Sequence, residues 1–116
     1  MSDLWAQTVK EIRSILEEST DDPVSSSTAA NAWDLVTQIR SDHMPPTEVG
    51  RGYRPTICMS WNEVSPKGFQ IEVHEDKYEF YRFFEGRTEI AELHHRAGDD
   101  FPPETLEKLH IISMIV

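Results

Sequence analysis

The sequence predicts an α+β fold: an N-terminal helical hairpin packed on a four-stranded antiparallel β-meander, followed by a short C-terminal helix. Three observations lead to this fold class. Up to residue 43, apolar residues recur in steps of three and four, which is the spacing of one helix face. Residues 68–95 alternate apolar and polar side chains, with two breaks at turn-forming pairs. A chain of 116 residues suffices for one core, so residues 1–116 are expected to form a single domain.

Two helices are predicted before the sheet, separated by the turn-forming linker from Thr20 to Ser27. The first runs from Ser2 to Glu18 and turns one apolar stripe inward, formed by Leu4, Trp5, Val9, Ile12, Ile15 and Leu16. The second runs from about Thr28 to His43, with Ser26 or Ser27 as its N-cap. Its apolar face is formed by Ala30, Trp33, Val36 and Ile39. Helices of this length are marginal alone in water, so both stripes need the sheet.

The segment from His43 to Pro55 is expected to cross to the sheet as an irregular loop, because it holds three prolines and two glycines. The first predicted strand, Thr56 to Asn62, places three apolar side chains on one face, namely Ile57, Met59 and Trp61. Cys58 lies on the opposite face. It is the only cysteine, which excludes an internal disulfide and a thiolate zinc cluster, and we expect it to be a small strand side chain.

The turn positions predict the register of the meander. If Glu75-Asp76 is the tip of the first hairpin, Val73 lies opposite Tyr78 and Ile71 lies opposite Phe80, on the same face as Phe69. A five-residue loop before Phe69 then sets Trp61, Met59 and Ile57 against that face, which becomes the core. A two-residue turn at Glu85-Gly86 adds Leu93 and Ala91 to the core. A bulged turn, which would bring Ile90 inward, stays open as an alternative.

The opposite, outer face of the meander carries the candidate site residues. Under the simpler register three glutamates, bracketed by His74 and His94, lie in a row across three strands: Glu72, Glu79 and Glu92. The other half of this face is apolar and aromatic, with Tyr81, Phe83 and Ile90. Like charges that face one another across strands cost free energy, so the row needs an explanation.

Three interpretations of the outer face are open at this point. Long glutamates on an exposed sheet can spread into water, and they also discourage aggregation. Alternatively, the aromatic half can anchor a partner while the glutamates attract its basic surface. Third, histidine and carboxylate groups can bind a divalent metal ion, although no HExxH spacing is present. Adjacent strand residues point to opposite faces, so His94 and His95 are a poor ligand pair.

After the meander, a turn at residues 99–103 is expected to lead into a short helix that turns Leu106 and Leu109 inward. Residues 111–116, IISMIV, either finish that helix or form a strand, because short apolar runs do not distinguish the two. These side chains must be hidden from water. They either dock within the domain or form a subunit contact, in which case the protein is a homodimer.

Composition narrows the range of partners. The chain has 21 acidic and 11 basic residues and a formal net charge of −10. A field of this sign disfavours nucleic acid and anionic membranes, and it attracts basic partners. The N-terminus lacks the basic start and apolar run of a secretory signal, and no apolar stretch approaches the ~20 residues that cross a bilayer. We therefore expect a cytoplasmic protein.

No motif of a known chemistry appears: the glycines form neither GxGxxG nor a P-loop, and there is no GxSxG elbow. We therefore predict a small acidic module without a cofactor and without enzymatic activity. It would bind a protein partner through the outer face, as an adaptor, an inhibitor or an antitoxin-like protein. The alternative is a metal-dependent or acid–base enzyme that uses His74, His94 and the glutamate row.

The order of helix, proline-rich crossing and three strands loosely resembles small uncharacterised bacterial proteins with a helix-plus-meander build. The matching residues are Pro55 and Ile57, Ile71 through Val73, and Asp76 through Tyr81, and the resemblance covers about half of the chain. It implies the same fold. It carries no function and no site residue.

Overall fold

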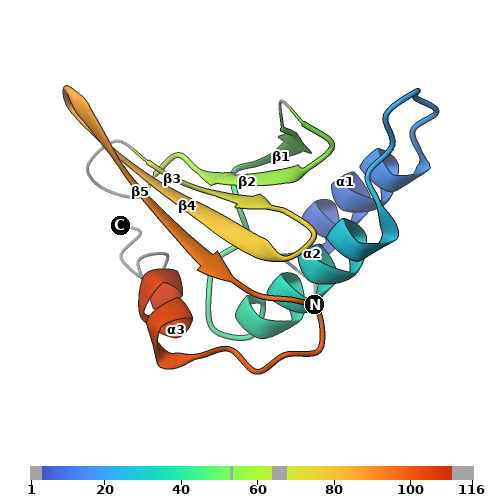
Figure 1. The fold of residues 1–116 in the computed structure, drawn as a ribbon. Helices are drawn as coiled ribbons and strands as arrows, with labels where there is room; N and C mark the ends of the chain where they lie inside the picture. The colour runs from blue at the N-terminus through green and yellow to red at the C-terminus, as the bar shows by residue number, and fades with distance from the viewer. Residues whose placement is uncertain (1–3, 53, 64–67, 111–116) are drawn as a thin grey trace.

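The computed structural model describes residues 4–52, 54–63 and 68–110, and within these ranges it shows the predicted α+β fold. A five-stranded antiparallel sheet carries the described helices on one of its faces (Figure 1). In chain order the elements are α1 (Ala6–Glu17), α2 (Ser26–Ile39), β1 (Glu48–Arg51), β2 (Ile57–Trp61), β3 (Phe69–Val73), β4 (Lys77–Phe84), β5 (Arg87–His94) and α3 (Pro103–Leu109). None of these described helices is long and apolar enough to cross a membrane.

The five strands follow one another in the sheet in chain order, so the sheet is a continuous meander. The predicted registers are confirmed. Tyr78 lies opposite both Val73 and Leu93, and Phe80 lies opposite both Ile71 and Ala91. The last hairpin closes through the predicted two-residue turn, in which Gly86 takes a φ of +80°.

A strand that the sequence analysis did not predict lies at the edge of the sheet. β1 falls in the segment that was expected to be an irregular loop, and it pairs with β2 over four residues. Only one of its residues, Val49, is a good strand former, and glycine at position 50 is unfavourable in a strand. The strand therefore forms because β2 offers an unpaired edge, which no local pattern could reveal. The prediction of four strands was wrong by this one.

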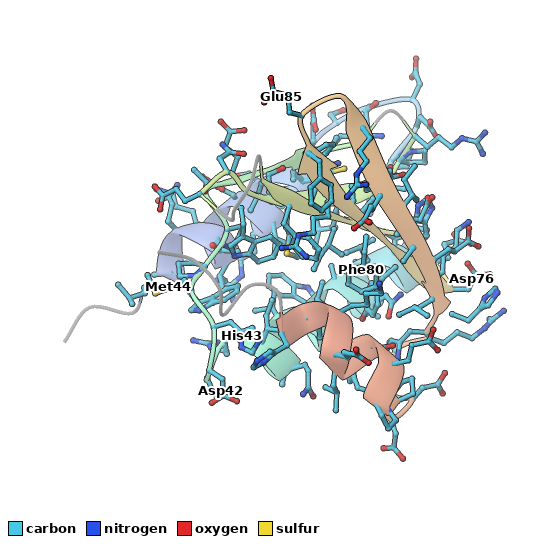
Figure 2. All side chains as sticks on the ribbon, turned by 90° about the vertical axis from the view of Figure 1, so that its left-hand side faces the viewer. Asp42, His43, Met44, Asp76, Phe80 and Glu85 are labelled. Carbon is cyan, nitrogen blue, oxygen red and sulfur yellow. The ribbon has the colours of Figure 1, made fainter. Side chains whose placement is uncertain are left out.

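The core lies between the sheet and the described helices. Strands β2, β3 and β4 contribute their alternate residues, and the helices contribute one face each; the buried apolar residues are Trp5, Ile12, Ala32, Leu35, Val36, Ile39, Ile57, Met59, Trp61, Phe69, Ile71, Val73, Tyr78, Phe80 and Leu109. Figure 2 shows Phe80 on the side of the sheet that faces α3. Burial of each large side chain in this set contributes roughly 1.5–3 kcal/mol, so the core determines which face of the sheet is covered.

Helix α2 differs from the prediction in both of its ends and in its buried face, since it runs from Ser26 to Ile39 and not from Thr28 to His43. Ser25, one residue before the predicted caps, accepts a hydrogen bond from the backbone N–H of Thr28. Trp33 is only half-buried, whereas the polar Asn31 is fully buried. The Asn31 amide donates to the carbonyl oxygens of His74 and His95, each at 3.0 Å, and its Oδ1 accepts from the Tyr78 hydroxyl. Asn31 thus joins α2 to the ends of two strands.

The segment after β5 is attached to the core by a buried histidine. His95 Nε2 lies 2.7 Å from Asp34 Oδ2 on α2, and the imidazole ring stacks on both Tyr78 and Phe101, which also contact one another. Burial, with the charge of Asp34, raises the pKa of the Tyr78 phenol well above its ordinary value, so this hydroxyl stays a donor. These contacts direct the chain toward α3.

Two smaller predictions about the helices are decided by the burial of leucine side chains. Leu109 of α3 is buried as predicted, but Leu106 is 41% exposed. Leu4 does not belong to the buried stripe of α1, because it is 64% exposed. Residues 111–116, predicted to finish the last helix or to form a strand, lie outside the described residues, as does Ser2, the predicted start of the first helix.

Candidate functional site on the outer sheet face

The face of the sheet opposite the helices carries the predicted site residues. In the described part of the chain, the helices pack against the other face, so alternate side chains of β3, β4 and β5 point away from them. The two halves of this outer face differ in burial. Ile90 is 63% exposed, whereas the side chains of Glu72 and Glu79 are only 14% and 19% exposed.

Glu72 and Glu79 lie directly opposite one another on β3 and β4, and their side chains converge rather than spread apart. His74, the residue after β3, turns its ring toward both of them. Its Nε2 lies 3.5 Å from Glu72 Oε1 and in contact with Glu79 Oε1. The ligand atoms of these three residues, which we call the Glu–His–Glu cluster, lie within 4.8 Å of one another.

Tyr81 belongs to the acidic half of the face. Its hydroxyl donates to Glu79 Oε2 at 3.2 Å, and Glu72 Oε1 lies 3.5 Å away. Burial, together with the negative charges of Glu79 and Glu72, raises the pKa of Tyr81 to about 12. At neutral pH Tyr81 is therefore a hydrogen-bond donor to the carboxylates and not a base.

Two further residues hold Glu72 from the side of β2. The Thr56 hydroxyl donates to Glu72 Oε2 at 2.5 Å. Gly52 passes so close that a Cβ at this position would lie 2.1 Å from Thr56 Oγ1 and 2.5 Å from Glu72 Oε2. No side chain fits at position 52 unless these groups move, so the glycine is required by close packing.

The Cys58 thiol lies beside this arrangement. Burial, followed by the negative charge of Glu72, raises the pKa of Cys58 to about 11. The thiolate, which is the nucleophilic form, is therefore scarce at neutral pH. This agrees with the expectation that Cys58 is an ordinary strand side chain.

A cavity of about 380 Å³ opens over the cluster and is lined by Arg54, Glu72, His74, Lys77 and Glu79. Lys77 Nζ forms an ion pair with Glu92 Oε1 at 3.2 Å. This hydrogen bond is the main cause of the raised pKa of Lys77. Glu92, the third glutamate of the predicted row, is thus balanced by its own lysine.

The structure therefore brings together only some of the predicted site residues. Glu72, Glu79 and Tyr81 meet, with His74 from the metal alternative. His94 is exposed and lies opposite Lys77 in the register, and it is not part of the cluster among the described residues. Glu92 is separate, as are the two apolar residues Phe83 and Ile90.

Sequence reasoning missed the residues that support the cluster. Thr56 is two residues before Cys58 in the predicted strand and so falls on the same outer face by alternation, a signal that could have identified it as a neighbour of Glu72. Gly52 and Arg54 gave no such signal, because their positions depend on the path of the chain between β1 and β2.

Comparison with protein-family models, curated proteins and solved structures finds no match to this chain. The resemblance to small bacterial proteins stays a prediction. The chemistry and exposure of the outer face are therefore the basis for the proposals that follow.

Proposed function

We propose that the protein is a non-enzymatic interaction module of the cytoplasm that binds a basic protein partner through the outer face of its sheet. Adaptors, inhibitors and antitoxin-like proteins all need such a surface for their partner. The observation that carries the proposal is Ile90, a large apolar side chain that is 63% exposed on the same face as the glutamates. An apolar anchor surrounded by charge is the usual build of a small interface.

The shape of the last hairpin supports the proposal. β4 and β5 each have eight residues, whereas β2 and β3 have five, and the β4–β5 hairpin extends past the other strands (Figure 1). Glu85 lies at its tip (Figure 2). On the outer face of this hairpin Ile90 of β5 lies opposite Tyr81 of β4, and Phe83 is two residues after Tyr81 on the same strand. We call Phe83 and Ile90 the apolar group. A partner could therefore contact the apolar group without displacing any described helix.

The charge of the chain supports a basic partner. The net charge is −10, and two of its carboxylates, those of Glu72 and Glu79, lie on the same face as the apolar residues of the last hairpin. Electrostatic attraction of this kind mainly speeds association, and it weakens as salt screens the charges. Binding should therefore have an apolar part that resists salt and an ionic part that does not.

The test is affinity capture of partners from a lysate at about 50 mM and about 500 mM salt. At the higher concentration the Debye length is well below 10 Å, so attraction between surface charges is largely screened. Three proteins are compared: the native chain, the double variant Phe83→Ala/Ile90→Ala, and the control Leu106→Ala. The control removes another exposed apolar side chain from α3, away from the outer face.

A specific partner should be captured by the native chain and by Leu106→Ala, and it should be lost with Phe83→Ala/Ile90→Ala. High salt should reduce its recovery. If every captured protein is retained equally by the double variant, the outer face is not the binding surface and the proposal fails.

A further inference from the structure

We propose that Glu72, His74 and Glu79 form a binding site for a divalent transition-metal ion of the Zn²⁺ class. The proposal concerns the isolated chain and does not rest on the interaction proposed above. It assigns a ligand to the cluster and claims no catalytic step.

The two glutamates are held close together, where their like charges repel. Directly opposed like charges on neighbouring strands cost free energy, and exposed glutamates usually relieve it by turning apart. Glu72 and Glu79 instead converge while most of each side chain is removed from water. Arg54 is the nearby cation in the cavity that is not engaged in a described ion pair, and two carboxylates against one guanidinium leave a net negative charge.

His74 supplies the observation that is independent of the acidic pair. Its Nε2 is shielded from solvent and faces both carboxylates, yet within the described chain it is not aligned for a hydrogen bond with either of them. A buried ring nitrogen normally has an aligned partner. A metal ion between this nitrogen and the two carboxylate oxygens would accept the lone pair of Nε2.

The distances suit an ion after small side-chain rotations. Ligand atoms about 2.1 Å from a tetrahedral zinc ion lie about 3.4 Å from one another. The three ligand atoms lie within 4.8 Å of one another, and His74 Nε2 and Glu79 Oε1 are already in contact. Small rotations would therefore bring all three separations to the distance that zinc requires. The backbone, which is fixed by the register of β3 and β4, does not have to move.

The carboxylates are also oriented from behind. The Oε2 atom of Glu72 accepts from Thr56, and the Oε2 atom of Glu79 accepts from Tyr81. Both Oε1 atoms consequently face His74. Outer hydrogen bonds of this type orient the ligands of metal sites, and their loss typically lowers metal affinity by about 10–100-fold. Three protein ligands leave a fourth position for water.

The ligand set selects the kind of metal. One imidazole with two carboxylates suits zinc, manganese or iron, whereas Ca²⁺ prefers six to eight oxygen ligands and Mg²⁺ keeps most of its waters. The net charge of −10 raises the local concentration of any cation, so selectivity has to come from the histidine. Zn²⁺ is the probe of choice.

The experiment is calorimetric titration of the tag-free full chain with ZnCl₂, supported by the absorption spectrum of the Co²⁺ form. The decisive comparison is His74→Ala with His94→Ala, since His94 is an exposed histidine outside the cluster. Glu79→Gln is compared in the same way with Glu92→Gln, the glutamate paired with Lys77. Circular dichroism checks the fold of each variant.

The native chain, His94→Ala and Glu92→Gln should each bind one Zn²⁺, and the melting temperature should rise by several degrees at ~100-fold excess over Kd. His74→Ala should lose at least about 100-fold in affinity, and Tyr81→Phe about 10-fold. Absence of saturable binding by the native chain overturns the proposal. Equal losses for His74→Ala and His94→Ala also overturn it, because binding would then be nonspecific. If His74→Ala does not fold, the zinc affinities of Glu79→Gln and Glu92→Gln are compared instead, and equal affinities overturn the proposal.

Discussion

Replacement of Asn31 by aspartate should strongly destabilise the fold, because it exchanges one buried NH₂ group of α2 for an oxygen. Asn31 is fully buried, and its amide nitrogen donates to two backbone carbonyls, those of His74 and His95, each at 3.0 Å. Aspartate has the same shape. It replaces the donor by an oxygen that faces both carbonyls.

The magnitude follows from these contacts. A buried carbonyl that loses its partner costs about 1–3 kcal/mol; the hydrogen bond to His95 is buried and that to His74 is partly buried, so their loss costs about 2–5 kcal/mol before any charge repulsion is counted. The Tyr78 hydroxyl keeps its acceptors, the backbone oxygen and Oδ1 of residue 31, at 2.9 and 3.0 Å. We expect a loss of about 4 kcal/mol, which is a large part of the 5–15 kcal/mol typical of a domain.

The loss should depend on pH with a definite sign. Burial and the two carbonyls disfavour the ionised form, so the pKa of the introduced carboxyl is higher in the folded than in the unfolded state. The folded state then binds more protons, and the free energy of unfolding falls as pH rises from about 4 through the folded pKa. Asn31→Asp should therefore be less destabilised at pH 5.5 than at pH 8.

The assay is urea unfolding followed by tryptophan fluorescence, with Asn62→Asp as the matched control. Asn62 is exposed on the turn after β2, so the same change of atoms and charge there should cost less than about 0.5 kcal/mol. If Asn31→Asp lies within about 1 kcal/mol of that control, or if its loss of stability is the same at both pH values, the two hydrogen bonds donated by Asn31 do not stabilise the fold by the expected amount.

Two further predictions concern the surroundings of Glu72. Gly52→Ala should cost about 1–3 kcal/mol in urea unfolding, because its Cβ would meet Thr56 and Glu72, whereas Gly50→Ala, with nothing within 4 Å, should be nearly neutral. Equal stability of the two variants would contradict the close packing at position 52. Since burial and Glu72 raise the pKa of Cys58 to about 11, its alkylation by iodoacetamide should accelerate about tenfold per pH unit from pH 8 to 10, and should be far slower than in the urea-unfolded chain. A rate that levels off below pH 9 would show that the thiol ionises more easily.

The core and the register were predictable because both depend on patterns that local sequence carries. Alternation in β3 and β4 buries Ile71 and Phe80 together in the observed register, and a slip of one residue would move one of them to the opposite face. The turn pairs fixed where each strand ends. Strand β1 was missed because it has no such pattern, and its pairing is supplied by β2.

The candidate site was predictable only in outline. Alternation placed Glu72 opposite Glu79, and this follows from the register alone. It could not say whether their side chains spread into water or converge. That outcome depends on Thr56, Tyr81 and the ring of His74, which reach the carboxylates from three different positions along the chain.

By itself the sequence determined the fold class, the face of the sheet that the helices cover, and the sign of the charge on the outer face. These properties arise from periodicity, turn residues and composition, which act over a few residues at a time. The tertiary structure alone decided that Asn31 is buried and that Gly52 lies against a carboxylate. It alone decided, too, that a histidine and two glutamates share one cavity. Contacts of this kind join residues far apart in the chain, so their geometry depends on how whole elements pack.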